Sequence, residues 1–157
     1  MGNGKTSAGL ILYRRRDGEL EVLIAHMGGP YWANKKRGWS IPKGEYAPDE
    51  DPLACARREF EEETGSAPPV GEPLDLGEIV QKSGKRVRAW ALEGDLDPAG
   101  AFSNHIEIEW PPRSGRLVEI PEVDRVEWFR PDEAKDLVIK AQGELFDRLR
   151  DRLIDGS

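Results

Sequence analysis

Short apolar runs in the first half of the chain predict β-strands. Residues 10–13 and 20–25 form two such runs, and the Asp17-Gly18 pair between them is typical of a hairpin turn. A polar loop follows at residues 28–38. Further strand-like segments occur at residues 76–81, 87–92, 105–110 and 126–129.

The segment between residues 51 and 65 has a helical pattern. Asp51 is suited to cap the start of a helix, Pro52 suits the first helical position, and Gly65 suits the end. At about 100° per residue, four side chains fall on one stripe, which we expect to pack on the sheet. The stripe consists of Leu53, Ala56, Phe60 and Thr64.

A second helix is predicted to begin at Pro131. Leu145, Leu149 and Leu153 repeat every four residues towards its end. The order of elements is therefore strands, helix, strands, helix, which predicts an α/β sandwich with a mixed sheet between helices. No stretch has the composition of a linker between domains, and we expect a single domain over residues 1–157.

Composition and charge narrow the function classes. The chain has 157 residues and a net charge of −7, which argues against a protein that mainly binds a nucleic-acid backbone. A single cysteine, Cys55, excludes an internal disulfide and a cysteine-rich zinc site, and fits a reducing compartment. No apolar run approaches the ~18–20 residues that cross a bilayer. We therefore expect a cytoplasmic protein without a membrane partner.

The predicted helix at residues 52–64 carries an unfavourable cluster of acids. Glu59, Glu62 and Glu63 are three or four residues apart or adjacent, and like charges at the helical spacings cost about 0.2–0.5 kcal/mol per pair. They also lie in the last two turns, where the helix dipole disfavours anions. Arg58 is spaced to pair with Glu62. The cluster is either a solvated acidic face or a site for a hard cation such as Mg²⁺ or Mn²⁺.

The surrounding residues favour the cation site, because they form a known motif. Gly44 is followed after five residues by Glu50, and after seven more by Arg58-Glu59-Phe60-Glu61-Glu62-Glu63-Thr64-Gly65. This pattern resembles the Nudix box, G-x5-E-x7-R-E-U-x-E-E-x-G-U, where U is a bulky apolar residue, over residues 44–66. Eight of the nine defined positions match, and Ser66 replaces the last apolar residue. The order of strands and helices extends the resemblance over most of the chain, and implies a Nudix-type α/β/α sandwich.

The resemblance implies a metal-dependent hydrolase that cleaves a pyrophosphate bond in a nucleoside diphosphate linked to another moiety. The cofactor would be Mg²⁺ or Mn²⁺. Arg58 would orient the carboxylates, and Glu50 would assist through a water or a neighbouring residue. The positions that the resemblance assigns to metal binding are Gly44, through its carbonyl, Glu59, Glu62 and Glu63.

The general base would be a glutamate of the box or one from a loop outside it. Glu107 and Glu109 are candidates for the base or for an extra ligand, because their spacing of two puts both on one face of a strand. A solvent-facing pair is the alternative.

The loop before the helix contains candidate substrate-binding residues. Flat aromatic rings can stack on a base, and cations can bind phosphates that a metal leaves uncovered. Trp39-Ser40-Ile41-Pro42-Lys43-Gly44 also resembles the Trp-x-x-Pro-Lys-Gly segment of Nudix enzymes that act on diadenosine polyphosphates and related nucleoside polyphosphates. The candidates are Trp32, Lys35, Lys36, Arg37, Trp39 and Lys43, with core packing as the alternative for the tryptophans and a solvated loop for the lysines.

A phosphorylated small molecule, a nucleotide above all, is thus the expected partner. Two alternatives stay open: a module that senses a nucleotide on the same fold, and a pyrophosphohydrolase of RNA ends. The full set of box carboxylates disfavours the first, and the net charge of −7 disfavours the second.

Overall fold

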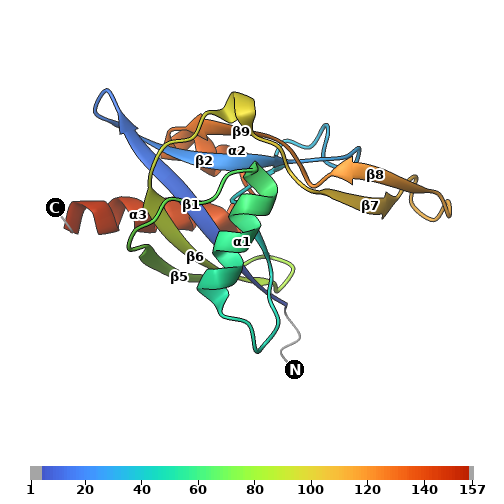
Figure 1. Ribbon diagram of the computed structural model, residues 1–157, viewed down its shortest axis with the longest axis horizontal. Helices are drawn as coiled ribbons and strands as arrows, with labels where there is room; N and C mark the ends of the chain where they lie inside the picture. The colour runs from blue at the N-terminus through green and yellow to red at the C-terminus, as the bar shows by residue number, and fades with distance from the viewer. Residues whose placement is uncertain (1–4, 156–157) are drawn as a thin grey trace.

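A mixed β-sheet lies at the centre of the molecule, with helices on both of its faces (Figure 1). The computed structural model describes residues 5–155. The strands are β1 (Thr6–Arg16), β2 (Glu19–Met27), β3 (Trp39–Ser40), β4 (Lys43–Glu45), β5 (Leu74–Val80), β6 (Arg86–Glu93), β7 (His105–Glu109), β8 (Leu117–Pro121) and β9 (Val123–Phe129). The helices are α1 (Pro52–Thr64), α2 (Pro131–Leu137) and α3 (Gly143–Asp155), with short 3₁₀ turns η1 (Pro98–Gly100) and η2 (Lys140–Gln142).

The main sheet has the strand order β3-β2-β1-β6-β5, and β4 and β9 are added to β1 and β2. β1 runs parallel to β6, whereas its pairings with β2 and β4 are antiparallel. Asp17 and Gly18 join β1 to β2, and both have a positive φ, 52° and 81°, as a tight hairpin turn requires. The predictions of a mixed sheet and of this hairpin are confirmed.

Side chains of β1 alternate between two apolar layers. Leu10 and Leu12 lie on one face and pack in a cluster with Phe60 of α1. Ile11 lies on the other face, in a cluster with Leu149 of α3. This alternation follows from the two-residue period of a strand. The sheet is therefore covered by α1 on one side and by α2 and α3 on the other, which confirms the predicted sandwich.

Helix α1 begins and ends where the sequence predicts. The carboxylate of Asp51 accepts a hydrogen bond of 3.0 Å from the backbone N–H of Ala54. Gly65 ends the helix with a φ of 80°, a left-handed conformation that glycine adopts without strain. Phe60 and Thr64 of the predicted stripe are fully buried. Helix α1 is thus packed firmly against the sheet, and Glu59, Glu62 and Glu63 lie beside its buried face.

The predicted C-terminal helix is broken into two, which corrects the prediction. Between α2 and α3, Val138 forms a parallel bridge with Trp39, and the N–H of Ile139 donates to the carbonyl of Trp39 over 3.2 Å. The two β-branched residues Val138 and Ile139 therefore pair with β3 at the edge of the sheet instead of continuing the helix. Among residues 5–155, no helix is both long enough and apolar enough to cross a membrane.

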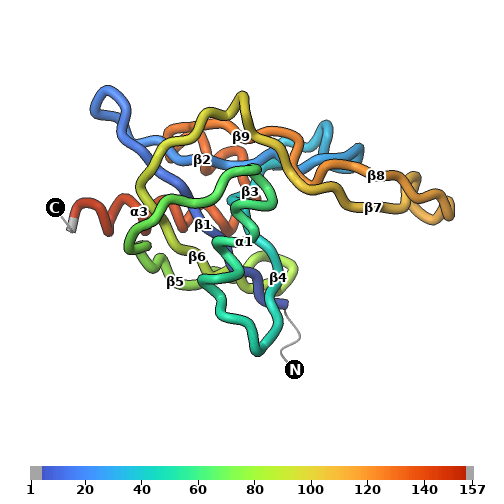
Figure 2. The backbone as a smooth tube through the Cα atoms, viewed as in Figure 1, coloured from blue at the N-terminus to red at the C-terminus, as the bar shows by residue number. Residues whose placement is uncertain are grey.

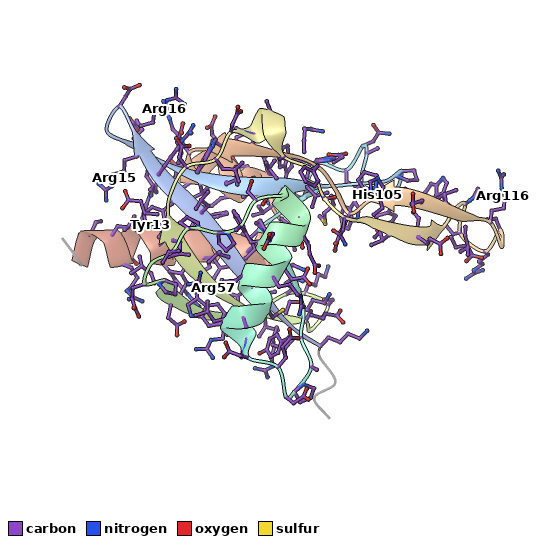
Figure 3. The ribbon with its side chains drawn as sticks, in the orientation of Figure 1. Tyr13, Arg15, Arg16, Arg57, His105 and Arg116 are labelled. Atoms are coloured by element: carbon purple, nitrogen blue, oxygen red, sulfur yellow. The ribbon has the colours of Figure 1, made fainter. Side chains whose placement is uncertain are left out.

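β7 and β8 form a separate two-stranded sheet that projects from the body of the molecule (Figures 1 and 2). His105 lies near the root of this hairpin and Arg116 near its tip (Figure 3). The sequence predicts β7 but not β8. The single domain over residues 1–157 stays a prediction, and residues 1–4 and 156–157 lie outside the described part of the chain.

Candidate active site

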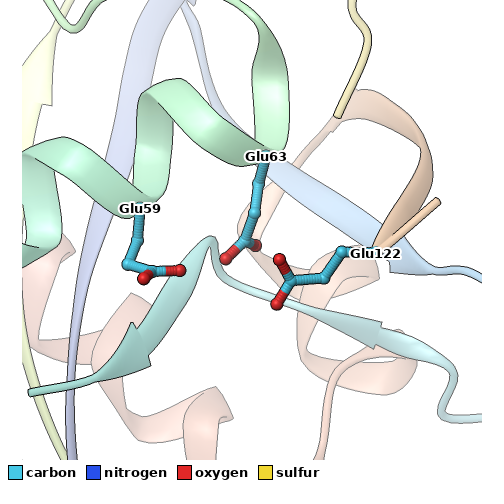
Figure 4. Close-up of side chains that lie close together, drawn as sticks. All are labelled: Glu59, Glu63 and Glu122. Carbon is cyan, nitrogen blue, oxygen red and sulfur yellow. The ribbon is translucent and has the colours of Figure 1, made fainter. Parts of the chain in front are cut away.

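Three carboxylates from two distant segments converge beside the C-terminal half of α1. Glu59 and Glu63 come from α1, and Glu122 comes from the connection between β8 and β9 (Figure 4). One carboxylate oxygen from each of the three lies within 4.8 Å of the others. Such convergence of anions is unfavourable without a cation, and carboxylate oxygens are the ligands that Mg²⁺ prefers.

Glu63 is the most deeply buried of the three carboxylates. The residue is 5% exposed, and its Oε2 atom is buried without a hydrogen-bond partner. Burial, followed by the charge of Glu122, raises the pKa of Glu63 well above its ordinary value. Burial also raises the pKa of Glu122. An unpartnered buried carboxylate oxygen aimed at two further carboxylates fits a divalent cation.

Gly44 lies directly against the Glu59 carboxylate. A Cβ atom at residue 44 would overlap that carboxyl group, so only glycine allows strand β4 to run this close to α1. Gly44 is paired with Ala8 of β1 in the sheet, and its carbonyl lies 3.5 Å from the buried thiol of Cys55. This close approach places the backbone of Gly44 beside the cluster, and the assignment of its carbonyl as a metal ligand stays a prediction.

Arg58 contacts three glutamates on or near helix α1. Its guanidinium donates to the carboxylate of Glu50, to Glu59 at 3.2 Å, and lies 3.5 Å from Glu62. Hydrogen bonding to Glu59 raises the pKa of Arg58 further, so that it keeps its charge. We predicted that Arg58 orients Glu62 and that Glu50 acts through a neighbour. The structure places all of these groups in one contact network, with Arg58 as its centre.

Glu62 lies beside the three-carboxylate cluster but outside it. It lines a polar hollow of about 390 Å³, which we call the acidic hollow. The hollow is lined by Ser7, Lys43, Gly44, Glu45, Glu59, Glu62, Lys85, Asn104 and Glu122. Glu62 therefore faces the same space as the cluster, and its assignment as a metal ligand stays a prediction.

Lys43 stands between the acidic hollow and a second, mostly apolar cavity of about 510 Å³. Burial lowers the pKa of Lys43, and the charges of Glu63 and Glu122 oppose that shift. Lys43, Glu63 and Glu122 all line the apolar cavity. The rest of its wall includes Met27, Tyr31, Trp32, Ile106, Ile108, Trp110 and Ile120. A molecule with a phosphate end and an apolar end could occupy both spaces at once.

The structure separates the loop residues that the sequence grouped together. Trp32 lines the apolar cavity, in agreement with a role in stacking. Trp39 is 7% exposed and packs edge-on against His26 and Phe129, which agrees with the alternative of core packing, and a contact of its ring with the substrate stays a prediction.

Arg37 has a structural role, and its predicted contact with a phosphate stays a prediction. Its guanidinium donates to the carbonyls of Lys135 and Val138, both at 2.9 Å, and so satisfies the free acceptors at the end of α2. Lys35 lies over the Tyr31 ring, with its ammonium 4.8 Å from the centroid, and Lys36 is exposed. For these two lysines, phosphate binding stays a prediction.

Glu107 and Glu109 lie on the hairpin and not in the carboxylate cluster. Glu107 is exposed, and the carboxylate of Glu109 accepts from the N–H groups of Arg113 and Gly115 in the hairpin turn. Glu109 lines the apolar cavity, and a catalytic role for either residue stays a prediction. The sequence did not reveal Glu122, because it follows a short strand that was itself not predicted and no periodic pattern links it to α1.

Solved structures resemble this fold over nearly the whole chain. An Ap4A hydrolase of C. elegans in a binary complex is 22% identical, with a TM-score of 0.62, covering 96% of this chain and 98% of that one. The NUDIX domain of Shewanella oneidensis NrtR, in complex with ADP ribose, is 17% identical, with a TM-score of 0.63 and coverages of 96% and 88%. A Nudix hydrolase from M. smegmatis, RenU, is 20% identical, with a TM-score of 0.55 and coverages of 96% and 86%. At these identities the likeness shows the fold.

Membership of a family rests on the sequence. No functionally curated protein matches the chain significantly. The family model of the NUDIX domain matches residues 5–149, which include the whole acidic helix, strand β4 and Glu122. The chain therefore belongs to the Nudix family, as a pyrophosphohydrolase.

Proposed function

We propose that the protein hydrolyses a pyrophosphate bond in a nucleoside or dinucleoside polyphosphate, with Mg²⁺ or Mn²⁺ as cofactor. One observation carries this proposal: the carboxylates of Glu59, Glu63 and Glu122 converge at the place where a polar hollow meets an apolar cavity. The cluster suits a cation that binds phosphates, and the cavity suits the moiety attached to them.

Glu59, Glu63 and Glu122 would hold the cation, with the carbonyl of Gly44 and the carboxylate of Glu62 close by. A divalent cation bound there lowers the pKa of a coordinated water and offsets the negative charge of the phosphate oxygens. Among the three carboxylates, Glu63 gains most from such an ion, because its buried oxygen has no other partner.

The remaining residues position the substrate and the carboxylates. Lys43 lines both spaces and would bind a phosphate oxygen that the cation leaves uncovered. Arg58 holds Glu59 and Glu62 in place and is itself held by Glu50. These contacts fix the carboxylates before the substrate arrives, and such preorganisation is a main source of catalysis in phosphoryl chemistry.

Two of the structural relatives support a nucleotide as the substrate class. One is described as an Ap4A hydrolase, and the other is complexed with ADP ribose. Ap4A and ADP ribose both carry adenosine on a chain of phosphates. The −7 net charge disfavours a long nucleic acid and leaves small nucleotides as the favoured class. We also propose that the enzyme acts in the cytoplasm, on the basis of its single cysteine.

The test is a panel of dinucleoside polyphosphates, nucleoside triphosphates and nucleoside diphosphate sugars, assayed with Mg²⁺ for the release of phosphorylated products. We expect turnover that EDTA abolishes and that Glu63→Gln lowers by at least about 100-fold. Glu61→Gln is the matched control, since it makes the same change at an exposed position of α1. If nucleotides bind but none is cleaved with any divalent ion, the chain is a sensor and the proposed function is wrong.

A further inference from the structure

The hairpin formed by β7 and β8 has one apolar face although it belongs to no larger sheet. Ile106 pairs with Ile120, and Ile108 pairs with Val118. Directly paired residues lie on the same face of an antiparallel ladder, and residues two apart share that face. The four side chains therefore form a continuous aliphatic surface.

This surface covers the apolar cavity instead of a protein core. Ile106, Ile108 and Ile120 all line that cavity, opposite the loop that carries Tyr31 and Trp32. The other face of the hairpin carries polar residues and Leu117, which is 65% exposed and lines none of the cavity. The aliphatic face of the hairpin is therefore positioned to contact an apolar group bound in the cavity.

The hairpin is fixed to the opposite wall at its root. The N–H of Gly28 donates to the carbonyl of Glu122 over 3.0 Å, and the N–H of Glu122 donates to the carbonyl of Asn104 over 2.9 Å. Gly29, with a φ of 88°, leaves the room that the Ile120 side chain occupies, because a Cβ at Gly29 would overlap it. The two walls therefore meet at a close backbone contact, and the cavity is formed before a ligand binds.

We propose that the isoleucine face of this hairpin determines substrate specificity by holding the planar base of a nucleotide against the loop that carries Trp32. The inference rests on the proposed function, and it names the part of the substrate that the apolar cavity receives. Lys43, Glu63 and Glu122 are neighbours in the lining of the cavity, so phosphates belong beside them. Trp32 and Trp110 also line the cavity, and their indole rings favour a flat aromatic group beside them.

Binding without turnover tests this proposal separately from the proposed function. AMP and ribose 5-phosphate differ by the base alone, and their binding with Mg²⁺ can be followed by tryptophan fluorescence. We expect Ile108→Ala to raise the Kd of AMP about tenfold and to leave that of ribose 5-phosphate unchanged. Ile106→Ala, at a more exposed position of the same face, should act in the same direction.

Leu117→Ala is the matched control, because it removes the same kind of side chain from the opposite face of the same hairpin. It should change the Kd of neither ligand. Equal effects of Ile108→Ala and Leu117→Ala, or an equal loss of both ligands in Ile108→Ala, would overturn the proposal. So would a short alkyl phosphate that binds the parent protein as tightly as AMP. Tight, base-dependent binding without hydrolysis of any substrate would support base binding by the isoleucine face and contradict the proposed function.

Discussion

Replacement of Glu63 by glutamine should stabilise the metal-free protein, although it removes a group from the candidate active site. Glutamine keeps the shape of the side chain and removes its charge. In the parent, Glu63 is 5% exposed, has one unpartnered oxygen, and lies beside Glu59 and Glu122. Without a cation, the folded state therefore contains a buried charge next to two like charges, and the unfolded state does not.

The geometry sets the size of this effect. Two unit charges 4.8 Å apart repel by about 3.5 kcal/mol at an effective dielectric constant of about 20. Movement of the side chains and entry of water reduce this cost, and we expect a gain of about 1–3 kcal/mol in the free energy of unfolding at pH 8. For a chain of this length, that corresponds to a melting temperature higher by roughly 3–10 °C.

The pH dependence follows from the raised pKa of Glu63. A raised pKa means that the folded parent holds its proton more tightly than the unfolded chain does. The parent therefore loses stability as the pH rises from the ordinary carboxyl pKa through the raised value, whereas glutamine does not titrate. The advantage of Glu63→Gln should be largest above the raised pKa and should vanish at low pH, where Glu63 is protonated.

Thermal unfolding with EDTA and with Mg²⁺ provides the assay. Mg²⁺ at 100 times its Kd should stabilise the parent by about 2.7 kcal/mol, and Glu63→Gln should lose most of that gain, so that its advantage over the parent is offset. Glu61→Gln, exposed on the same helix, should stay within about 0.5 kcal/mol of the parent in EDTA. A Glu63→Gln protein that is no more stable than Glu61→Gln in EDTA, or a gain that does not depend on pH, would refute the electrostatic reasoning.

Three further predictions concern single residues. Lys43→Ala should raise KM about tenfold, and more for substrates with longer phosphate chains, as steady-state kinetics would show. Trp39→Ala should cost about 3–5 kcal/mol in urea unfolding because it empties part of the core, whereas Trp32→Ala should cost less than about 1 kcal/mol and should raise KM. Burial raises the pKa of Cys55 to about 11, so its alkylation by iodoacetamide at pH 8 should be roughly 100-fold slower in the folded protein than in urea.

Helix α1 shows what local chemistry reveals without a structure. Its start depends on Asp51 and its end on Gly65, and both signals act within a few residues of the position they define. The ion pair of Arg58 and Glu62 likewise follows from helical spacing alone. The part of the site that lies within one continuous segment could therefore be predicted residue by residue.

The parts that sequence reasoning missed or assigned to another role all depend on contacts between distant segments. Trp39 and Trp32 look alike in sequence, but the pairing of Trp39 with Val138 draws one into the core while the other stays at the cavity. Arg37 looks like a phosphate ligand until the end of α2 supplies carbonyls for it. Glu122 becomes a candidate ligand only because the hairpin returns to the sheet beside α1. Tertiary contacts decide each of these roles, and no local pattern records them.

The same geometry explains how an unfavourable cluster of charges persists in a stable fold. Glu59 and Glu63 are fixed by a helix whose buried face is packed on the sheet, so they cannot move apart without a loss of core contacts. Glu122 is fixed by backbone hydrogen bonds to Gly28 and Asn104 on either side of the hairpin root. Packing of apolar residues elsewhere thus supplies the energy that holds the carboxylates together. A cation bound among them would join helix α1 to the root of the hairpin, and the metal site and the wall of the apolar cavity would then become parts of one rigid unit.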